Sequence, residues 1–165
     1  MKFVIPSLAR YSIIKKKTLK LLNDYNISKK DIYVFVVEEE YDKYKEEIGI
    51  DINIVVGERG ISEQRAFISS YFNEGEKLVS LDDDISKIYE LKNNKLIKLE
   101  SLYKLCDKAF SILGGVGMVG VYPTDNPYYM SQSVSTDLKF CIGQMRMFYN
   151  TQSIENSRNY KLLEV

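Results

Sequence analysis

Short apolar runs alternate along the first half of the chain with segments that have helical spacing. The apolar runs are typical of buried strands and lie at residues 2–5, 31–37, 52–56 and 77–81. The segments between them predict helices at residues 12–26, 38–47 and 61–72. The second of these helices is expected to be short, acidic and exposed. This alternation predicts an α/β fold: a single-domain, Rossmann-like, mainly parallel central sheet with flanking helices.

A different pattern begins after residue 85. Lys92-Asn93-Asn94 is suited to a hairpin turn, and Ser101 is a candidate N-cap for a helix that Gly114-Gly115 would end. The expected elements are a hairpin, a helix and two strands, at residues 87–99, 101–113, 118–122 and 138–150.

The composition excludes several kinds of chemistry. With 165 residues and 45% hydrophobic residues, the chain can build a proper core. Its 23 basic and 23 acidic residues cancel, which gives no argument for a general affinity for nucleic acid or anionic membranes. Histidine is absent, which excludes a Ser-His-Asp triad and histidine-ligated metals. The two cysteines, Cys106 and Cys141, lie in apolar segments and are expected to be buried free thiols.

Targeting signals are not evident. No signal peptide precedes the first predicted strand, and no run approaches the roughly 20 apolar residues that span a bilayer. We therefore expect a cytoplasmic protein without a membrane span.

The apolar run at residues 77–81 ends in three consecutive carboxylates, Asp82, Asp83 and Asp84. Adjacent like charges are costly near a core unless a cation neutralises them. If the alternation of a strand continues, Asp82 and Asp84 point the same way and make a site for a hard cation such as Mg²⁺ or Mn²⁺. The alternative is an acidic turn that caps the next segment.

Polar, charged or glycine residues also follow the other three predicted parallel strands. Ligands of open α/β sheets bind at the carboxyl ends of such strands, so the convergence predicts a nucleotide site. A hydroxyl and a guanidinium near a helix start can hold ribose or phosphate, although an ordinary N-cap beside a solvated arginine is the alternative. The candidates are Pro6, Ser7 and Arg10 after the first strand, Glu38 and Glu39 after the second, and Arg59 and Gly60 after the third.

Arg65 is out of place in the predicted helix at residues 61–72, because it lies in line with the apolar Ile61, Ile68 and Phe72. An arginine on a core-facing side needs an anion or a carbonyl partner. We expect this partner to be the nucleotide or an aspartate of the triplet. The alternative is a side chain that extends outward into solvent.

The loop at residues 123–136 is polar and aromatic. Its Asp125, Asn126, Tyr128 and Tyr129 suit a sugar or an acceptor, unless the tyrosines only pack on the sheet. Asp137, directly after this loop, is either a cap or a carboxylate of the site.

The ordered set of these elements resembles the glycosyltransferases of the type A fold. The pattern Arg59-Gly60-Ile61-Ser62-x-x-Arg65, followed by an apolar strand that ends in Asp-Asp-Asp-Ile, is similar to small virus-encoded glycosyltransferases and to TET-associated glycosyltransferases. Ile5-Pro6-Ser7-x-x-Arg10 and the strand end at Glu38-Glu39 also fit the nucleotide pocket of these enzymes. The resemblance covers residues 1 to about 150.

This resemblance implies a hexosyl- or pentosyltransferase that uses Mn²⁺ or Mg²⁺. The donor would be a nucleotide-sugar, with a UDP-sugar preferred, and the acceptor a glycan or a modified nucleic-acid base. Residues 1–85 would be the nucleotide-binding half and residues 86–165 the acceptor-side half. A viral origin would place the protein in the host cytoplasm. The implied roles are metal ligation by Asp84 and Asp82, contact of Asp82 with ribose or donor sugar beside Asp83, nucleoside binding by Ser7, Arg10 and Glu39, and support of the diphosphate by Arg65.

The catalytic base and the anomeric outcome remain open. Similar glycosyltransferases continue with a further acidic segment, so a truncated acceptor side is expected, and Asp125, Asp137 and Asp82 are the candidate catalytic carboxylates. One alternative is a nucleotidyltransferase, although Ser7-Leu8-Ala9-Arg10 lacks the glycines of its usual first loop. The other is a truncated module that binds nucleotide with little turnover.

Overall fold

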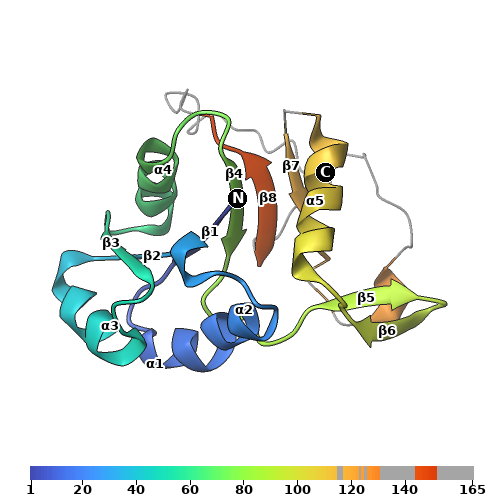
Figure 1. Ribbon diagram of the computed structural model, residues 1–165, viewed down its shortest axis with the longest axis horizontal. Helices are drawn as coiled ribbons and strands as arrows, with labels where there is room; N and C mark the ends of the chain where they lie inside the picture. The colour runs from blue at the N-terminus through green and yellow to red at the C-terminus, as the bar shows by residue number, and fades with distance from the viewer. Residues whose placement is uncertain (115–116, 123, 125, 131–143, 152–165) are drawn as a thin grey trace.

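The computed structural model describes residues 1–114, 117–122, 124, 126–130 and 144–151. Within these residues, six strands form a mixed sheet in the order β3-β2-β1-β4-β8-β7, and two more form a separate hairpin (Figure 1). β1 to β4 are parallel, β8 is antiparallel to β4, and β7 is antiparallel to β8. The predicted α/β fold with a mainly parallel sheet is thus confirmed. The strands are β1 (Lys2–Pro6), β2 (Ile32–Val36), β3 (Asn53–Val56), β4 (Lys77–Leu81), β5 (Tyr89–Lys92), β6 (Lys95–Lys98), β7 (Met118–Gly120) and β8 (Met145–Tyr149).

The helices follow the predicted segments with two differences. The expected helix at residues 12–26 is continuous but has a π-helical middle, and the acidic helix is not exposed throughout, because its Tyr44 is fully buried. The helical elements are α1 (Tyr11–Ile14), the π-helix η1 (Lys15–Leu19), α2 (Lys20–Asp24), α3 (Tyr41–Ile48), α4 (Ile61–Tyr71) and α5 (Leu102–Leu113), with short 3₁₀ turns η2 (Lys29–Asp31), η3 (Glu38–Glu40) and η4 (Pro127–Tyr129). In the part of the chain that the structure describes, no helix combines the length and apolar character needed to cross a membrane.

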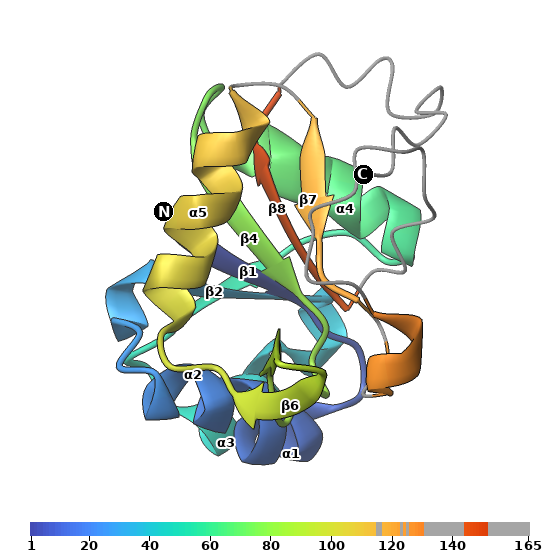
Figure 2. The ribbon, with the colours of Figure 1, turned by 90° about the vertical axis from the view of Figure 1, so that its right-hand side faces the viewer.

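Both faces of the sheet are covered, which explains why its strands are apolar at successive positions. On β1, Phe3 and Ile5 pack into the larger core with α5 and the first helical segment, whereas Val4 packs on the opposite face against α4. Figure 2 shows α4 and α5 on opposite sides of β4 and β8. Cys106 of α5 lies in the larger core as a free thiol, as predicted, and burial raises its pKa to about 12. Cys141 lies outside the described residues.

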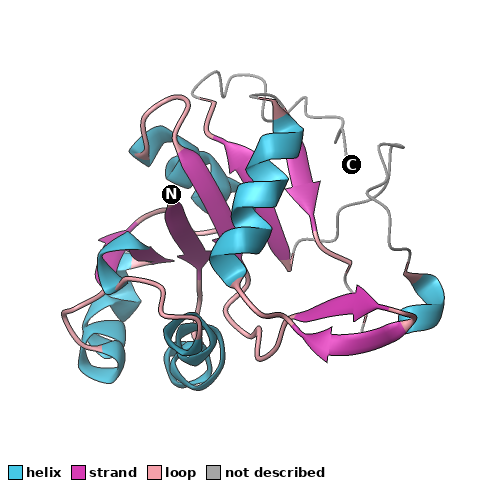
Figure 3. Ribbon diagram, turned by 45° about the vertical axis from the view of Figure 1, so that its right-hand side comes forward, coloured by secondary structure: helices cyan, strands magenta, loops and turns pink. Residues whose placement is uncertain are grey.

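The hairpin β5-β6 stands apart from the main sheet (Figure 3). Asn93 and Asn94 connect its strands, and both have positive φ, as a tight two-residue hairpin turn requires. Ser101 caps α5 by accepting a hydrogen bond from the Lys104 N–H, and the left-handed Gly114 ends the helix. These three predictions are confirmed.

The order of the strands creates a switch point between β1 and β4. The chain moves outward from β1 to β2 and β3 and then returns to the other side of β1 with β4. The connections on the two sides of this point diverge, which leaves a crevice outside the carboxyl ends of β1 and β4. The residues that follow these two strands are therefore the first place to look for a site.

Candidate functional site

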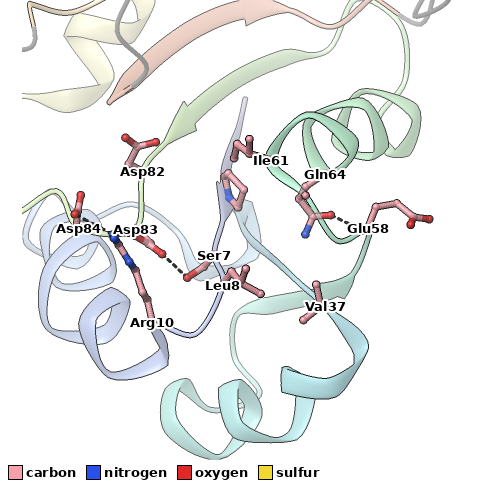
Figure 4. A pocket seen from close by; sticks show the side chains of 12 residues that line it. Ser7, Leu8, Arg10, Val37, Glu58, Ile61, Gln64, Asp82, Asp83 and Asp84 are labelled. Carbon is pink, nitrogen blue, oxygen red and sulfur yellow. Dashed lines mark hydrogen bonds and ion pairs between the residues drawn. The ribbon is translucent and has the colours of Figure 1, made fainter.

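A cavity of about 440 Å³ lies at this switch point (Figure 4). Its volume is within the range of roughly 300–1,000 Å³ that is usual for small-molecule sites. The segments that follow β1, β2, β3 and β4 all contribute to its wall, with Leu8, Val37 and Ile61 as apolar parts. The predicted site residues that line it are Pro6, Ser7, Arg10, Gly60, Asp82, Asp83 and Asp84.

A closed hydrogen-bond network fixes the first loop to the aspartate triplet. The Ser7 hydroxyl donates to Asp83 Oδ2 at 2.6 Å, so the Tyr44 hydroxyl must be the donor in its 2.7 Å bond to Ser7 Oγ. Tyr44 Oη in turn accepts the Arg10 N–H at 3.1 Å, and Arg10 Nη1 donates to Asp83 Oδ1 at 3.0 Å. Burial raises the pKa of Tyr44, so its hydroxyl remains a donor at neutral pH. The side-chain oxygens of Ser7, Tyr44 and Asp83 are therefore all used, and satisfied buried polar groups make such a network rigid.

Asp83 is a structural residue of this site. Its side chain is only 8% exposed and points toward Ser7, whereas Asp82 points away from it (Figure 4). The expected strand alternation does not extend through the triplet, because β4 ends at Leu81 and the aspartates lie in a turn. Asp83 therefore joins the loop after β1 to the loop after β4.

Asp82 and Asp84 have different surroundings. Asp84 is exposed and pairs with Arg10 Nη1 at 3.0 Å. Asp82 is partly buried, and burial raises its pKa, an effect that Arg65 opposes and that Asp84 reinforces. Asp84 is joined to the network only through the exposed Arg10 guanidinium, and Asp82 takes no part in the network, so both carboxylates are available to a ligand.

Thr18 supports the turn that carries the triplet, and sequence reasoning did not identify it. This fully buried residue of the π-helix η1 donates from its hydroxyl to the Asp82 carbonyl at 2.8 Å and accepts the Ile85 N–H at 2.9 Å. The two bonds hold both ends of the turn. π-helical segments inside helices often occur at functional sites, and here the segment contains the residue that holds the turn.

Replacing Thr18 with valine should destabilise the protein by about 1–3 kcal/mol. Valine is nearly isosteric with threonine, but it leaves the Ile85 N–H without its hydrogen-bond partner. Thr18→Ser keeps the hydroxyl and is the matched control. Urea unfolding followed by circular dichroism measures both variants. A Thr18→Val protein as stable as the wild type would show that the hydroxyl contributes little.

The β1 loop is also held from its outer side. Ala9 has a positive φ of 56°, which is uncommon for a residue other than glycine, and its N–H donates to Glu40 Oε2 at 2.7 Å. Glu40 thus contacts this loop directly, whereas the predicted Glu38 and Glu39 do not line the cavity. Glu39 instead pairs with Arg59 at 3.1 Å on the exposed surface, so the predicted residue Arg59 also lies outside the cavity wall.

The loop after β3 is shaped around Gln64. The Glu58 N–H donates to Gln64 Oε1 at 2.6 Å, and a Cβ at Gly57 would collide with the same side chain. Gly60, with a φ of 105°, begins α4 in a conformation that side chains rarely adopt. Gly57 therefore brings the backbone close to Gln64 at the cavity.

Arg65 is only partly buried, and it is not among the residues that line the cavity. Its Nε is buried and has no hydrogen-bond partner among the described residues. Asp82 and Arg146 are its charged neighbours: burial and then Arg146 lower the pKa of Arg65, and Asp82 raises it. An aspartate of the triplet is thus near Arg65, as predicted, but no ion pair forms between them within the described residues.

The donor atoms suit a divalent cation only in part. Among the described residues, no group of three or more histidine, cysteine, aspartate or glutamate side chains is arranged to hold a metal. Mg²⁺ in phosphate-binding sites is commonly held by one or two carboxylates together with substrate phosphates. Asp84 and Asp82 therefore fit a cation that binds together with a phosphorylated ligand, and do not form a complete cage by themselves.

A second cavity of about 560 Å³ is lined mainly by residues after the aspartate triplet. Tyr89 and Tyr122 line it together with the segment that directly follows the aspartate triplet, beginning at Ile85. Tyr128 and Tyr129 are largely exposed and do not pack on the sheet. The candidate carboxylates Asp125 and Asp137 lie outside the described residues.

No protein-family model matches this sequence, and a search of curated proteins likewise finds no match. The geometry of the site and the resemblance of its motifs therefore carry the proposed function.

Proposed function

We propose that this chain is a metal-dependent glycosyltransferase of the type A fold that takes a sugar from a nucleotide-sugar donor, with UDP-sugars as the preferred class. The observation that carries the proposal is the cavity at the switch point. Four strand ends contribute to it, and they bring together a serine hydroxyl, an arginine and two available carboxylates. Such a set suits a nucleoside diphosphate better than an uncharged metabolite.

The two sides of the cavity suit the two parts of a nucleotide. Leu8, nearly half exposed, and Val37 give an apolar surface for a base. Arg10 lies on the opposite side with its guanidinium partly exposed, so it can move from Asp84 to a phosphate oxygen. Asp83 would keep its bond to Arg10 and hold the guanidinium in place during this exchange.

Asp84 and Asp82 would hold the cation together with the diphosphate. A divalent cation at this position supplies charge stabilisation for the departing nucleoside diphosphate. The exposed Asp84 can reach such an ion without disturbing the fold. Asp82, whose burial favours its protonated form, would gain most from a nearby positive charge.

The second cavity is the proposed acceptor site. It begins at Ile85, directly after the triplet, so an acceptor there would approach the donor across the turn. Tyrosine side chains on its wall can stack on a sugar or on a base. Asp125 and Asp137 remain the carboxylates proposed as base.

Incubation with UDP-sugars and Mn²⁺ tests the proposal against its main competitor. A glycosyltransferase should release UDP slowly by hydrolysis when no acceptor is present, and we expect this release to be well below the ordinary enzyme rate of about 1 s⁻¹. In a parallel reaction with UTP and a sugar 1-phosphate, a nucleotidyltransferase would instead form a UDP-sugar and release pyrophosphate. Anion-exchange chromatography separates UDP from pyrophosphate. Formation of pyrophosphate without release of UDP would contradict the proposal.

A further inference from the structure

Gln64 is a buried polar side chain whose orientation is fixed at one end. The residue lies in the first turn of α4 and is only 5% exposed. Its Oε1 accepts the Glu58 N–H at 2.6 Å. Because a backbone N–H can only donate, the amide oxygen must face it, and the amide nitrogen must point the other way. Gln64 therefore presents two N–H donors away from Glu58.

These donors are directed into the first cavity. Gln64 lines the cavity, and its Nε2 is not among the fully buried atoms that lack a partner in the described part of the chain, so a ligand can reach it. Figure 4 shows the amide nitrogen on the side of Leu8 and Val37. Within the described residues, the side chain makes only the bond to Glu58. A buried amide group with unused donors favours a ligand that supplies an acceptor.

The loop after β3 keeps the amide in this orientation. The Gly57 N–H donates to the Val36 carbonyl at 2.8 Å, which ties the loop to the end of β2. A Cβ at Gly57 would collide with the side chains of Gln64 and Phe67, so the loop packs directly on the amide. Turning the amide around would place its NH₂ group against the Glu58 N–H. The donors are therefore oriented before a ligand binds, which lowers the cost of binding.

The place of Gln64 decides which edge of a bound base it would meet. The proposed base surface is formed by Leu8 and Val37, and the proposed diphosphate position lies beside Arg10 and Asp84. Gln64 lies on the side of the base surface and apart from Arg10 and Asp84 (Figure 4). A base anchored through its ribose and diphosphate would thus turn its far edge, opposite the glycosidic bond, toward the amide.

The far edge differs between the two pyrimidines. Uracil carries the carbonyl oxygen O4 there, which accepts a hydrogen bond, whereas cytosine carries an amino group, which donates. The donors of Gln64 suit uracil, whereas cytosine would leave a donor facing a donor. A site that pairs a buried donor with one ligand rejects a similar ligand that lacks the acceptor.

We propose that Gln64 reads the base of the donor and selects uridine nucleotides over cytidine nucleotides. This inference rests on the proposed function, because it assumes that a nucleotide occupies the first cavity with its base on Leu8 and Val37. It adds a specificity-determining residue that neither the aspartate triplet nor the first loop supplies.

Calorimetric titrations with UDP and CDP at pH 7.5 in the presence of Mn²⁺ test the inference. The wild-type protein should bind UDP at least about tenfold more tightly than CDP. Gln64→Glu keeps an acceptor for the Glu58 N–H and replaces the donors with a second acceptor at this pH, so it should bind the two nucleotides within about threefold or prefer CDP. Gln64→Met offers neither group and should also lose the preference.

Ser62→Asp is the matched control. Ser62 is an exposed residue of the same helical turn and is not among the residues that line the cavity. Its replacement adds the same negative charge near the start of α4, so the ratio of the two affinities should stay as in the wild type. An equal loss of the preference in this variant would show that charge, and not the amide, sets the selectivity, and the inference would be wrong.

The ratio of the affinities separates a base-reading role from a merely structural one. If Gln64 only shapes the loop, its variants weaken UDP and CDP equally and the preference persists, which overturns the inference. Equal binding of UDP and CDP by the wild type also overturns it and leaves the proposed function standing. If neither nucleotide binds, the proposed function is wrong and the inference falls with it.

Discussion

Asp84→Ala is expected to lower the affinity for UDP in the presence of Mn²⁺ by about tenfold or more, and to remove the difference between Mn²⁺ and excess chelator. Asp84 is the exposed carboxylate of the triplet at the donor cavity, and its partner there is Arg10. Losing it should remove a ligand of the cation and leave the fold intact, since exposed ion pairs contribute little to stability. Isothermal titration calorimetry measures the affinity.

Asp51→Ala provides the control for this substitution. Asp51 is another exposed aspartate with a basic partner, Lys29, at 3.1 Å. It is not among the residues that line the cavity, so its loss should leave UDP binding and its dependence on Mn²⁺ unchanged. An Asp84→Ala protein that kept the full effect of Mn²⁺ would show that the cation binds elsewhere.

In contrast to Asp84→Ala, which should leave the fold intact, Asp83→Ala is expected to lower the free energy of unfolding by about 2–3 kcal/mol. The substitution breaks the hydrogen bond from the buried Ser7 hydroxyl and leaves that group without its acceptor. It also removes one of the two aspartate partners of Arg10, so the first loop should lose its fixed position. Urea unfolding measures the loss.

Asp83→Asn separates shape from charge at the same position. The amide oxygen can still accept from Ser7, so this variant should lie between the wild type and Asp83→Ala in stability. A loss below about 0.5 kcal/mol for Asp83→Ala would mean that the network contributes little.

The parallel strands and the position of the site follow from local patterns. Apolar runs that are too short for helices and are followed by polar residues identified β1 to β4, and the rule for strand ends placed Ser7, Arg10 and the triplet in one cavity. These inferences succeed because each depends only on residues that are near in the chain and on the general geometry of α/β sheets.

The separate roles of the three aspartates could not be predicted in the same way. The expectation that Asp82 and Asp84 share a face assumed that β4 continues through the triplet, whereas the strand ends at Leu81. What bends the chain there is a hydrogen bond to Thr18, a residue 64 positions earlier in the sequence. A threonine that follows three lysines gives no sign of this role.

Tyr44 and Arg146 were missed for a related reason. Tyr44 lies in an acidic segment that suggests an exposed helix, yet its ring is buried and its hydroxyl joins the network. Arg146 lies opposite Ser80, near the triplet, only because β8 adds to the edge of β4 in antiparallel register. Such pairing between distant segments is a tertiary property that the periodicity of one segment does not contain.

A calorimetric titration of the wild-type protein with UDP, carried out once with Mn²⁺ and once with excess chelator, tests the central claim most directly. If the cavity at the switch point is the donor site of a metal-dependent glycosyltransferase, UDP should bind at a single site, and chelation should weaken binding by at least about tenfold. Equal affinity in the two titrations, or no binding in either, would contradict the account.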